Sequence, residues 1–93
     1  MKCGIYKITC IKSNKVYIGS SIDIDKRKNT HLCELRNGYH PNKHLQNSYN
    51  LYGEQNFKFE IIQKCNSEEE LILIENQNII LYNSLYPNGY NLE

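Results

Sequence analysis

Two short runs rich in β-branched and aromatic residues, 4–11 and 16–20, are separated by a polar stretch at 12–15. Runs of this composition bounded by polar residues predict strands, and a connection this short joins antiparallel neighbours. The beginning of the chain is therefore constrained to a β-hairpin, and the rest of the fold has to be built around a sheet. With 93 residues, the chain has room for one domain with one modest core.

The later segments predict two helices, a strand and a third helix. The helices are expected over about 24–37, 41–52 and 67–83, and the strand over 57–63. They are delimited by residues that start or stop helices, and Ser67 with Glu70 forms a capping box. The other delimiting residues are Asp23, Gly38, Pro41 and Gly53. The order β-β-α-α-β-α predicts an α+β fold, a small three-stranded antiparallel sheet flanked by helices, in which 1–93 is a single domain.

The hairpin brings two tyrosines together. A loop with an even number of residues puts Tyr6 and Tyr17 on the same face of the sheet, because side chains alternate with period two. A four-residue loop at 12–15 pairs Cys10 with Tyr17, whereas a six-residue loop at 10–15 pairs Ile8 with Tyr17, and the pattern allows both. Gly19 shares this face and is expected to leave a gap where a ligand can approach. The pair is equally compatible with two core tyrosines.

The charge is unevenly distributed although the net charge is only +1. All 11 Lys and Arg residues lie within 1–64 with five acids, whereas 65–93 contains five Glu residues and no basic residue. The first two-thirds of the chain can therefore present a basic face to phosphate groups. Arg27 and His31, four residues apart, share one helical face with Lys26 and Lys28 alongside. Arginine can grip a phosphate with two donors, and histidine can move protons near neutral pH, although an ordinary solvated face has the same pattern.

Glu75 lies on or beside the apolar stripe of the third helix, three or four residues from Leu71, Ile72 and Ile79. A carboxylate in such a position costs free energy unless it is paired or binds a metal ion. Asn78, one turn further on, is either a polar partner for Glu75 or a boundary residue. By contrast, the three glutamates at 68–70 complement the dipole of the helix in its first turn.

The four cysteines are interpreted as small, mostly buried hydrophobic residues. None forms a Cys-x-x-Cys pair, and a zinc site built from Cys33, His31 and His40 or His44 would have a spacing unlike common zinc sites. Two phenols, an arginine, a histidine and one inward carboxylate fit metal-assisted phosphodiester hydrolysis better. In that chemistry a divalent ion withdraws charge from the phosphate, arginine stabilises the transition state, and a base activates water.

These residues resemble the GIY-YIG nuclease superfamily. The signature consists of Gly4-Ile5-Tyr6 and Tyr17-Ile18-Gly19 with ten residues between the tyrosines, followed by Arg27, a helical Glu75 and the run Asn88 to Asn91. The similarity covers essentially the whole chain. It is closest to the catalytic domain of phage intron-encoded homing endonucleases, which share the Asn-Lys-Val-Tyr run ending at Tyr17.

The resemblance implies a role for each matching residue. Tyr6 would be the general base and Tyr17 would orient water or substrate, Arg27 would contact the phosphate, His31 would assist proton transfer, and Glu75 would hold one Mg²⁺ or Mn²⁺ ion. Gly19 would pack close to the site and Asn91 would support it. His40 matches a position that only some members use. The expected DNA-binding residues are Lys26, Arg27, Lys28, His40, Lys43 and His44.

The expected partner is double-stranded DNA, with weak sequence specificity from this chain alone. Homing members carry a further DNA-binding region, so the chain is expected to be either a catalytic module or a minimal nuclease that needs another domain or dimerisation. No apolar run approaches the length of a membrane span, and an intracellular location is expected. The alternative function is an inactive nucleic-acid-binding or assembly module, which would have no reason to keep Tyr6, Arg27 and Glu75 together.

Overall fold

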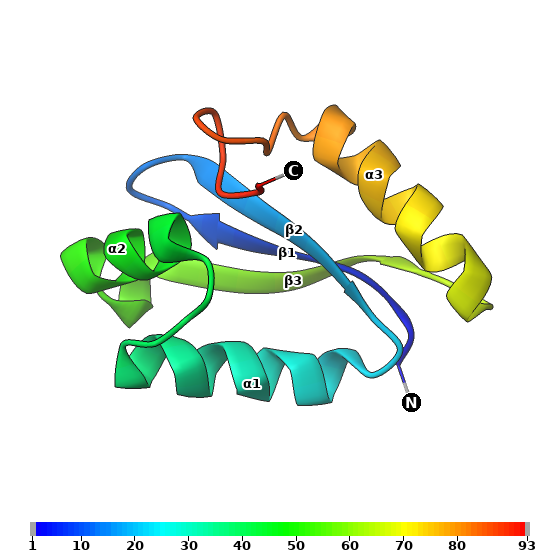
Figure 1. Ribbon diagram of the computed structural model, residues 1–93, viewed down its shortest axis with the longest axis horizontal. Coiled ribbons are helices and arrows are strands. Elements are labelled where there is room, and N and C mark those ends of the chain that lie inside the picture. The colour runs from blue at the N-terminus through cyan, green and yellow to red at the C-terminus, as the bar shows by residue number, and fades with distance from the viewer. Residues whose placement is uncertain (1, 93) are drawn as a thin grey trace.

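The sheet at the centre of the molecule has three antiparallel strands in the order β2-β1-β3, and the computed structural model describes residues 2–92 (Figure 1). The strands are β1 (Gly4–Cys10), β2 (Lys15–Ser21) and β3 (Phe57–Lys64). The helices are α1 (Ile24–Asn37), α2 (Lys43–Tyr52) and α3 (Leu71–Leu81), with short 3₁₀ turns at Glu54–Asn56 and Glu68–Glu70. The predicted α+β fold and its element order are confirmed.

The helices lie on both faces of the sheet, and each face has its own part of the core (Figure 1). Tyr6, Ile8 and Cys10 of β1 pack with α1 and α2. Ile5 and Ile18 point to the opposite face and pack with Leu71 of α3 and its neighbours. The alternation of side chains along β1 therefore separates an α1–α2 layer from an α3 layer.

The hairpin adopts one of the two predicted registers. Ile8 pairs with Tyr17 and Tyr6 with Gly19, and the ladder continues to a Cys10–Lys15 pair. The loop is closed by Asn14, which has a positive φ of 59°. The even loop therefore places both tyrosines on one face, as the sequence predicted.

The two helices that follow the hairpin end near the predicted residues. The Asp23 side chain accepts a hydrogen bond from the Lys26 amide at the start of α1, and Gly38 ends the helix with a φ of 81°. Gly53 ends α2, but Asn42 rather than Pro41 begins it, because the Asn42 side chain accepts a hydrogen bond from the Leu45 amide. The helix thus starts two residues later than expected.

Two sequence predictions about the third helix, its capping box and its end, are wrong. The Ser67 side chain makes no capping hydrogen bond, and a 3₁₀ turn precedes α3, which ends at Leu81 rather than near Asn83. Asn83 leaves the helical conformation with a φ of 52°. Among the cysteines, Cys10 and Cys65 are buried as expected, whereas Cys33 is exposed on α1 and contacts Tyr39 rather than a histidine.

The outer edge of β2 is covered by the end of the described chain. The Tyr90 amide donates to the Val16 carbonyl at 2.9 Å. The Asn91 side chain accepts from the Ile18 amide at 2.7 Å and donates to the Ile18 carbonyl at 2.8 Å. These bonds satisfy edge groups that would otherwise be free to pair with another strand. Over residues 2–92, no helix combines the length and apolarity that crossing a membrane requires.

Candidate active site

The two tyrosines of the hairpin form one wall of the site. Their ring centroids are 6.4 Å apart. Tyr6 is buried, and its ring stacks on Phe59 of β3 with a centroid distance of 5.0 Å. Tyr17 is only partly buried. The Tyr6 phenol is therefore held rigidly in the core, whereas Tyr17 lies at the border of the site.

Gly19 packs closely against Tyr6 and does not leave the predicted gap for a ligand. The space beside its Cα is filled by the Tyr6 ring, because a Cβ there would overlap the phenol carbon and oxygen. Tyr6 and Gly19 are direct cross-strand partners, so the small residue allows the ring to cross β2. The gap expected for a ligand is thus occupied by the protein itself.

Gly19→Ala is expected to destabilise the protein by about 1–3 kcal/mol and to reduce cleavage, because the added methyl group displaces a buried, stacked ring. Urea unfolding measures the stability change. Gly38→Ala is the matched control: its Cβ would meet nothing within 4 Å, and it carries only the cost of a positive φ. A Gly19→Ala protein as stable and active as wild type would contradict this assignment.

Four groups form a continuous hydrogen-bonded chain that ends at Tyr6. The Tyr6 hydroxyl lies 2.6 Å from His31 Nε2, and His31 Nδ1 lies 2.7 Å from His40 Nε2. The backbone amide of Asn42 donates to His40 Nδ1 at 3.0 Å. Both histidine rings are buried, with exposed fractions of 1% and 6%. These hydrogen bonds thus join β1 to α1 and to the loop that leads into α2.

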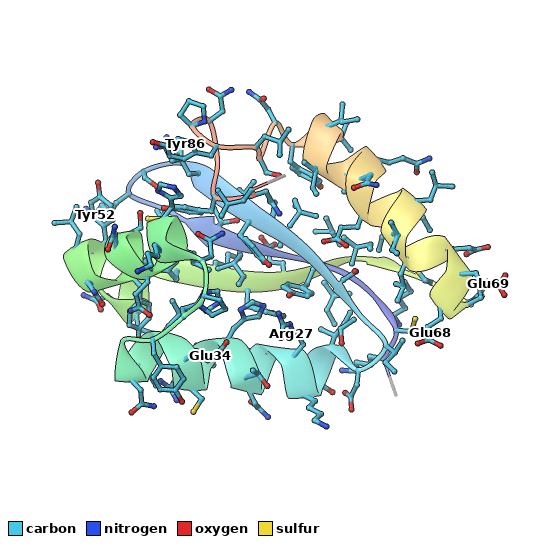
Figure 2. The ribbon with its side chains drawn as sticks, viewed as in Figure 1. Arg27, Glu34, Tyr52, Glu68, Glu69 and Tyr86 are labelled. Atoms are coloured by element: carbon cyan, nitrogen blue, oxygen red, sulfur yellow. The ribbon has the colours of Figure 1, made fainter. Side chains whose placement is uncertain are left out.

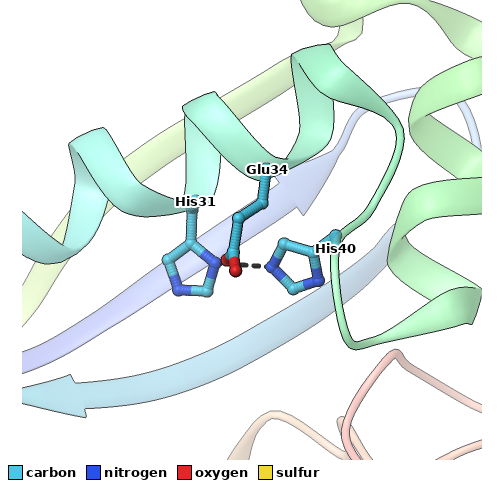
Figure 3. A group of neighbouring side chains, drawn as sticks. All are labelled: His31, Glu34 and His40. Carbon is cyan, nitrogen blue, oxygen red and sulfur yellow. Dashed lines mark hydrogen bonds between the residues drawn. The ribbon is translucent and has the colours of Figure 1, made fainter.

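His31, Glu34 and His40 also offer a set of donors that can hold a metal ion. One ligand atom from each lies within 4.8 Å of the others (Figure 3). Two imidazoles and a carboxylate are ligands typical of transition metals. In the structure, the two rings are hydrogen-bonded directly to each other, as the dashed line in Figure 3 marks.

Burial dominates the electrostatics of the site. It raises the pKa of Tyr6 and of Tyr17, while the positive charge of Arg27 opposes both shifts. Burial also lowers the pKa of His31 to about 3, helped by the nearby Arg27 and His40. The pKa of His40 is lowered mainly by burial as well. At neutral pH both phenols are therefore protonated and both imidazoles neutral.

Acid should destabilise the fold through His31. Its pKa is about 3 in the folded chain, against about 6.5 when unfolded, so between these values only the unfolded chain takes up the proton. Stability that is complete above pH 6.5 is lost at about 1.4 kcal/mol per pH unit as the pH falls, or about 2 kcal/mol at pH 5. Urea unfolding at pH 7.5 and 5.0 should show a smaller loss in His31→Gln than in wild type. An equal loss would show that His31 is not held neutral.

Glu75 reaches the site from the opposite face of the sheet. Because β2 is an edge strand, α3 can place this carboxylate beside the edge, where its Oε1 accepts a hydrogen bond from Ser20 Oγ at 2.8 Å. Leu71 is buried and Ile79 half-buried, as the apolar stripe predicted, but Ile72 is 72% exposed. Asn78 is no partner of Glu75, since its side chain donates to Gln63 and to the Ile74 carbonyl.

A hollow of about 420 Å³ crosses the edge of β2 and brings the two sides together. Arg27 points into the space between α1 and β2 (Figure 2). The side chains around the hollow come from five parts of the chain: Tyr17, Arg27, His40, Asn42, Glu75, Asn76, Ile79 and Asn91 contribute to it. Of the predicted site residues, Tyr6 and His31 lie behind this surface and connect to it through their neighbours.

Asn91 supports the site through the backbone. Its side chain forms two hydrogen bonds with Ile18, the residue between Tyr17 and Gly19. Asn42 and Ser20 also hold site residues, and sequence reasoning missed both. Asn42 had a recognisable signal, because an asparagine just before a helix is a preferred N-cap. Ser20 had none, since its contact with Glu75 joins residues 55 positions apart.

The six predicted DNA-binding residues differ in exposure, and Arg27, which lines the hollow, is half-buried. Lys26, Lys28 and Lys43 are exposed and can reach a phosphate backbone. His44 is half-buried and stacks on Tyr86, with ring centroids 4.1 Å apart. His40 does not fit the prediction, because it is buried and both of its ring nitrogens are used inside the protein.

Comparisons with known proteins identify the family and related structures. The family model of the GIY-YIG catalytic domain matches residues 2–91. The intron-associated endonuclease 1 of Enterobacteria phage T4 is 40% identical over 94 residues, which cover 99% of this chain and 37% of that protein. The chain therefore spans little more than a third of the length of this curated relative.

Two solved structures share the fold closely. The catalytic domain of the homing endonuclease I-TevI superimposes with a TM-score of 0.90 and 36% identity, covering 99% of both chains. The E75A mutant of the catalytic domain of the intron endonuclease I-TevI gives a TM-score of 0.90 and 37% identity, covering 100% of this chain and 95% of that one.

Proposed function

Because the chain belongs to the GIY-YIG family of nucleases, we propose that it is a divalent-metal-dependent DNA endonuclease that hydrolyses phosphodiester bonds. One observation supports the proposal above all others. Tyr17 and Arg27 from one face of the sheet and Glu75 from the other line the same hollow at the edge of β2. A phosphate placed there would meet a cation, a phenol and a carboxylate.

Glu75 is the residue we propose as the ligand of one Mg²⁺ or Mn²⁺ ion. A single carboxylate facing a roomy hollow fits Mg²⁺, which keeps several waters and is commonly held by one or two carboxylates together with substrate phosphate. Ser20 Oγ occupies one lone pair of Oε1 and fixes the orientation of the carboxylate. When bound, the ion would withdraw charge from the scissile phosphate and the leaving oxygen.

The other residues supply acid–base and electrostatic groups. Arg27 would stabilise the negative charge that develops on the phosphate, and Tyr17 would orient water or substrate. Tyr6 would act as the general base. Since burial raises its pKa, its phenolate has to be stabilised by the positive charge of Arg27 and by hydrogen bonding with His31.

The DNA-contacting surface we propose consists of Lys26, Arg27, Lys28, Lys43 and His44. All of them lie on α1 and α2, whereas the acidic segment after Cys65 has no cation to offer. Contacts of lysine and arginine with phosphates position a duplex without reading its sequence. Sequence selection by a homing-type enzyme would then need a further DNA-binding region or a dimer, in keeping with the greater length of the T4 relative.

Plasmid cleavage tests the proposed function. Supercoiled DNA incubated with the protein and Mg²⁺ should be converted to nicked and linear forms, and an excess of EDTA should abolish the conversion. Binding of DNA without cleavage under any divalent metal would favour the alternative, an inactive nucleic-acid-binding module. Retention of Tyr6, Arg27 and Glu75 in one arrangement supports the enzyme instead.

Tyr6→Phe is expected to lower the cleavage rate by roughly 10²–10⁴-fold, as loss of a general base does. Tyr17→Phe, the matched control, should cost less, because Tyr17 only orients the reactants. Both substitutions keep the ring, so the packing around Phe59 is preserved. Single-turnover cleavage measures both rates. If Tyr17→Phe proved much more damaging than Tyr6→Phe, the two roles would have to be exchanged.

A further inference from the structure

We propose that His40 is a positioning residue, which fixes the proton of His31 on Nε2 so that His31 donates a hydrogen bond to the oxygen of Tyr6. The inference rests on the proposed function, in which Tyr6 is the base. It starts from the buried chain of hydrogen bonds from Asn42 to Tyr6.

The Asn42 amide determines which atom donates in each of these hydrogen bonds. The Asn42 amide can only donate, so His40 Nδ1 has to accept and the proton of the neutral ring has to lie on Nε2. His40 Nε2 then donates to His31 Nδ1 across 2.7 Å, which leaves the His31 proton on Nε2. This proton points at Tyr6 Oη, which lies 2.6 Å from His31 Nε2. A single peptide N–H thereby determines the tautomer of both histidines.

The Asn42 amide, at which this series of hydrogen bonds begins, is held in place by neighbouring contacts. The Asn42 side chain accepts from the Leu45 amide at 3.0 Å and donates to the Tyr90 carbonyl at 2.6 Å. The His40 amide donates to Gln46 Oε1 at 3.0 Å. The loop between α1 and α2 is thus tied to α2 and to Tyr90, which keeps the Asn42 amide facing the His40 ring. Reversal of the ring would break its hydrogen bonds with the Asn42 amide and with His31.

The placement of these protons argues against a metal ion between the two histidines. A metal held by His31 and His40 needs a lone pair on each of the facing nitrogens, and His40 Nε2 carries a proton instead. His31 and His40 are therefore hydrogen-bonded to each other, and the Glu34 carboxylate beside them is a neighbour rather than a metal ligand.

A proton on His31 Nε2 would stabilise the phenolate form of Tyr6. An N–H that faces the oxygen stabilises negative charge on it through a charge-assisted hydrogen bond. With the opposite tautomer, the lone pair of His31 Nε2 would face the phenolate and repel it. His40 would therefore favour the reactive form of Tyr6 although its ring is hydrogen-bonded to His31 and the Asn42 amide rather than to Tyr6.

Long-range ¹H–¹⁵N correlation spectra of the ¹⁵N-labelled protein report which ring nitrogen carries the proton. The chain has only three histidines, and His44→Gln identifies the third set of signals. In wild type at pH 7, His31 and His40 should both be neutral with the proton on Nε2. A proton on Nδ1 of His31, or a charged His31 ring, would overturn the proposal without any variant being needed.

Two substitutions of His40 then test its control over His31. His40→Gln keeps an amide donor for His31 Nδ1 and an acceptor for the Asn42 amide, so the tautomer should persist and cleavage should stay within about 10-fold of wild type. His40→Glu offers only acceptors, so the His31 proton should move to Nδ1 and cleavage should fall roughly 10²–10³-fold.

The spectra separate failure of this inference from failure of the proposed function. An unchanged His31 tautomer in His40→Glu would reject the positioning role of His40, whatever the activity. A reversed tautomer with full cleavage would support His40 as the residue that orients His31 and would reject Tyr6 as the base. Loss of cleavage in His40→Glu together with rescue in His40→Gln would support both.

Discussion

Glu75→Ala should abolish Mg²⁺-dependent DNA cleavage, a loss of about 10⁴-fold or more, while the protein stays folded. Among the residues of 2–92 that line the hollow at the edge of β2, Glu75 has the only acidic side chain, so none of the others offers a carboxylate that could replace it as a metal ligand. Its removal leaves a half-buried position without charge, and the free energy of unfolding should change by less than about 1 kcal/mol or increase.

Cleavage kinetics and urea unfolding measure the two effects separately. Glu69→Ala is the matched control, because it removes the same charge from the exposed 3₁₀ turn that precedes α3. The control should cleave DNA at the rate of wild type. Substantial Mg²⁺-dependent cleavage by Glu75→Ala would rule out this residue as the metal ligand.

Arg27→Ala should reduce the cleavage rate by roughly 10³–10⁵-fold, the effect of removing an arginine that stabilises charge on a reacting phosphate. Part of the loss would come from Tyr6 and Tyr17, since the charge of Arg27 lowers the pKa of both phenols against the effect of burial. Arg27→Lys keeps the charge but loses the planar pair of donors, so it should recover only part of the rate.

The other arginine of the chain provides the control for this experiment. Arg36 lies on the same helix but is exposed and pairs with Glu54 through two hydrogen bonds of 2.7 and 3.0 Å. Arg36→Ala should cleave DNA normally and lose little stability, as expected for a surface ion pair. Equal damage from both substitutions would mean that Arg27 has no special part in the reaction.

The sequence by itself determined the features that depend on short-range periodicity. An even hairpin loop placed Tyr6 and Tyr17 on one face whichever register formed, because strand side chains alternate with period two. Helical spacing placed Arg27 and His31 on one face of α1, and Asp23 and Gly38 marked the ends of that helix. The fold order could be read for the same reason, since each element carries its own pattern and its own terminal residues.

Other features were decided only by the tertiary structure. The sequence left two hairpin registers open, and packing of Tyr6 across Gly19 accompanies the one that formed. His40 was predicted to bind DNA at the surface. No nearby sequence pattern indicates that the loop after α1 folds back and buries the His40 ring against His31. Ser20 and Asn91 acquired their contacts from residues 55 and 73 positions away.

Glu75 shows most clearly which features the sequence determined and which depended on the tertiary structure. Its position beside an apolar stripe marked it as unusual, but it said nothing about the face of the sheet on which α3 would pack. In the fold, α3 lies opposite α1, and Glu75 meets Arg27 only because β2 is an edge strand around which both can reach. A periodic pattern identifies the buried side of a helix, whereas its packing partner depends on how the whole chain fills the core.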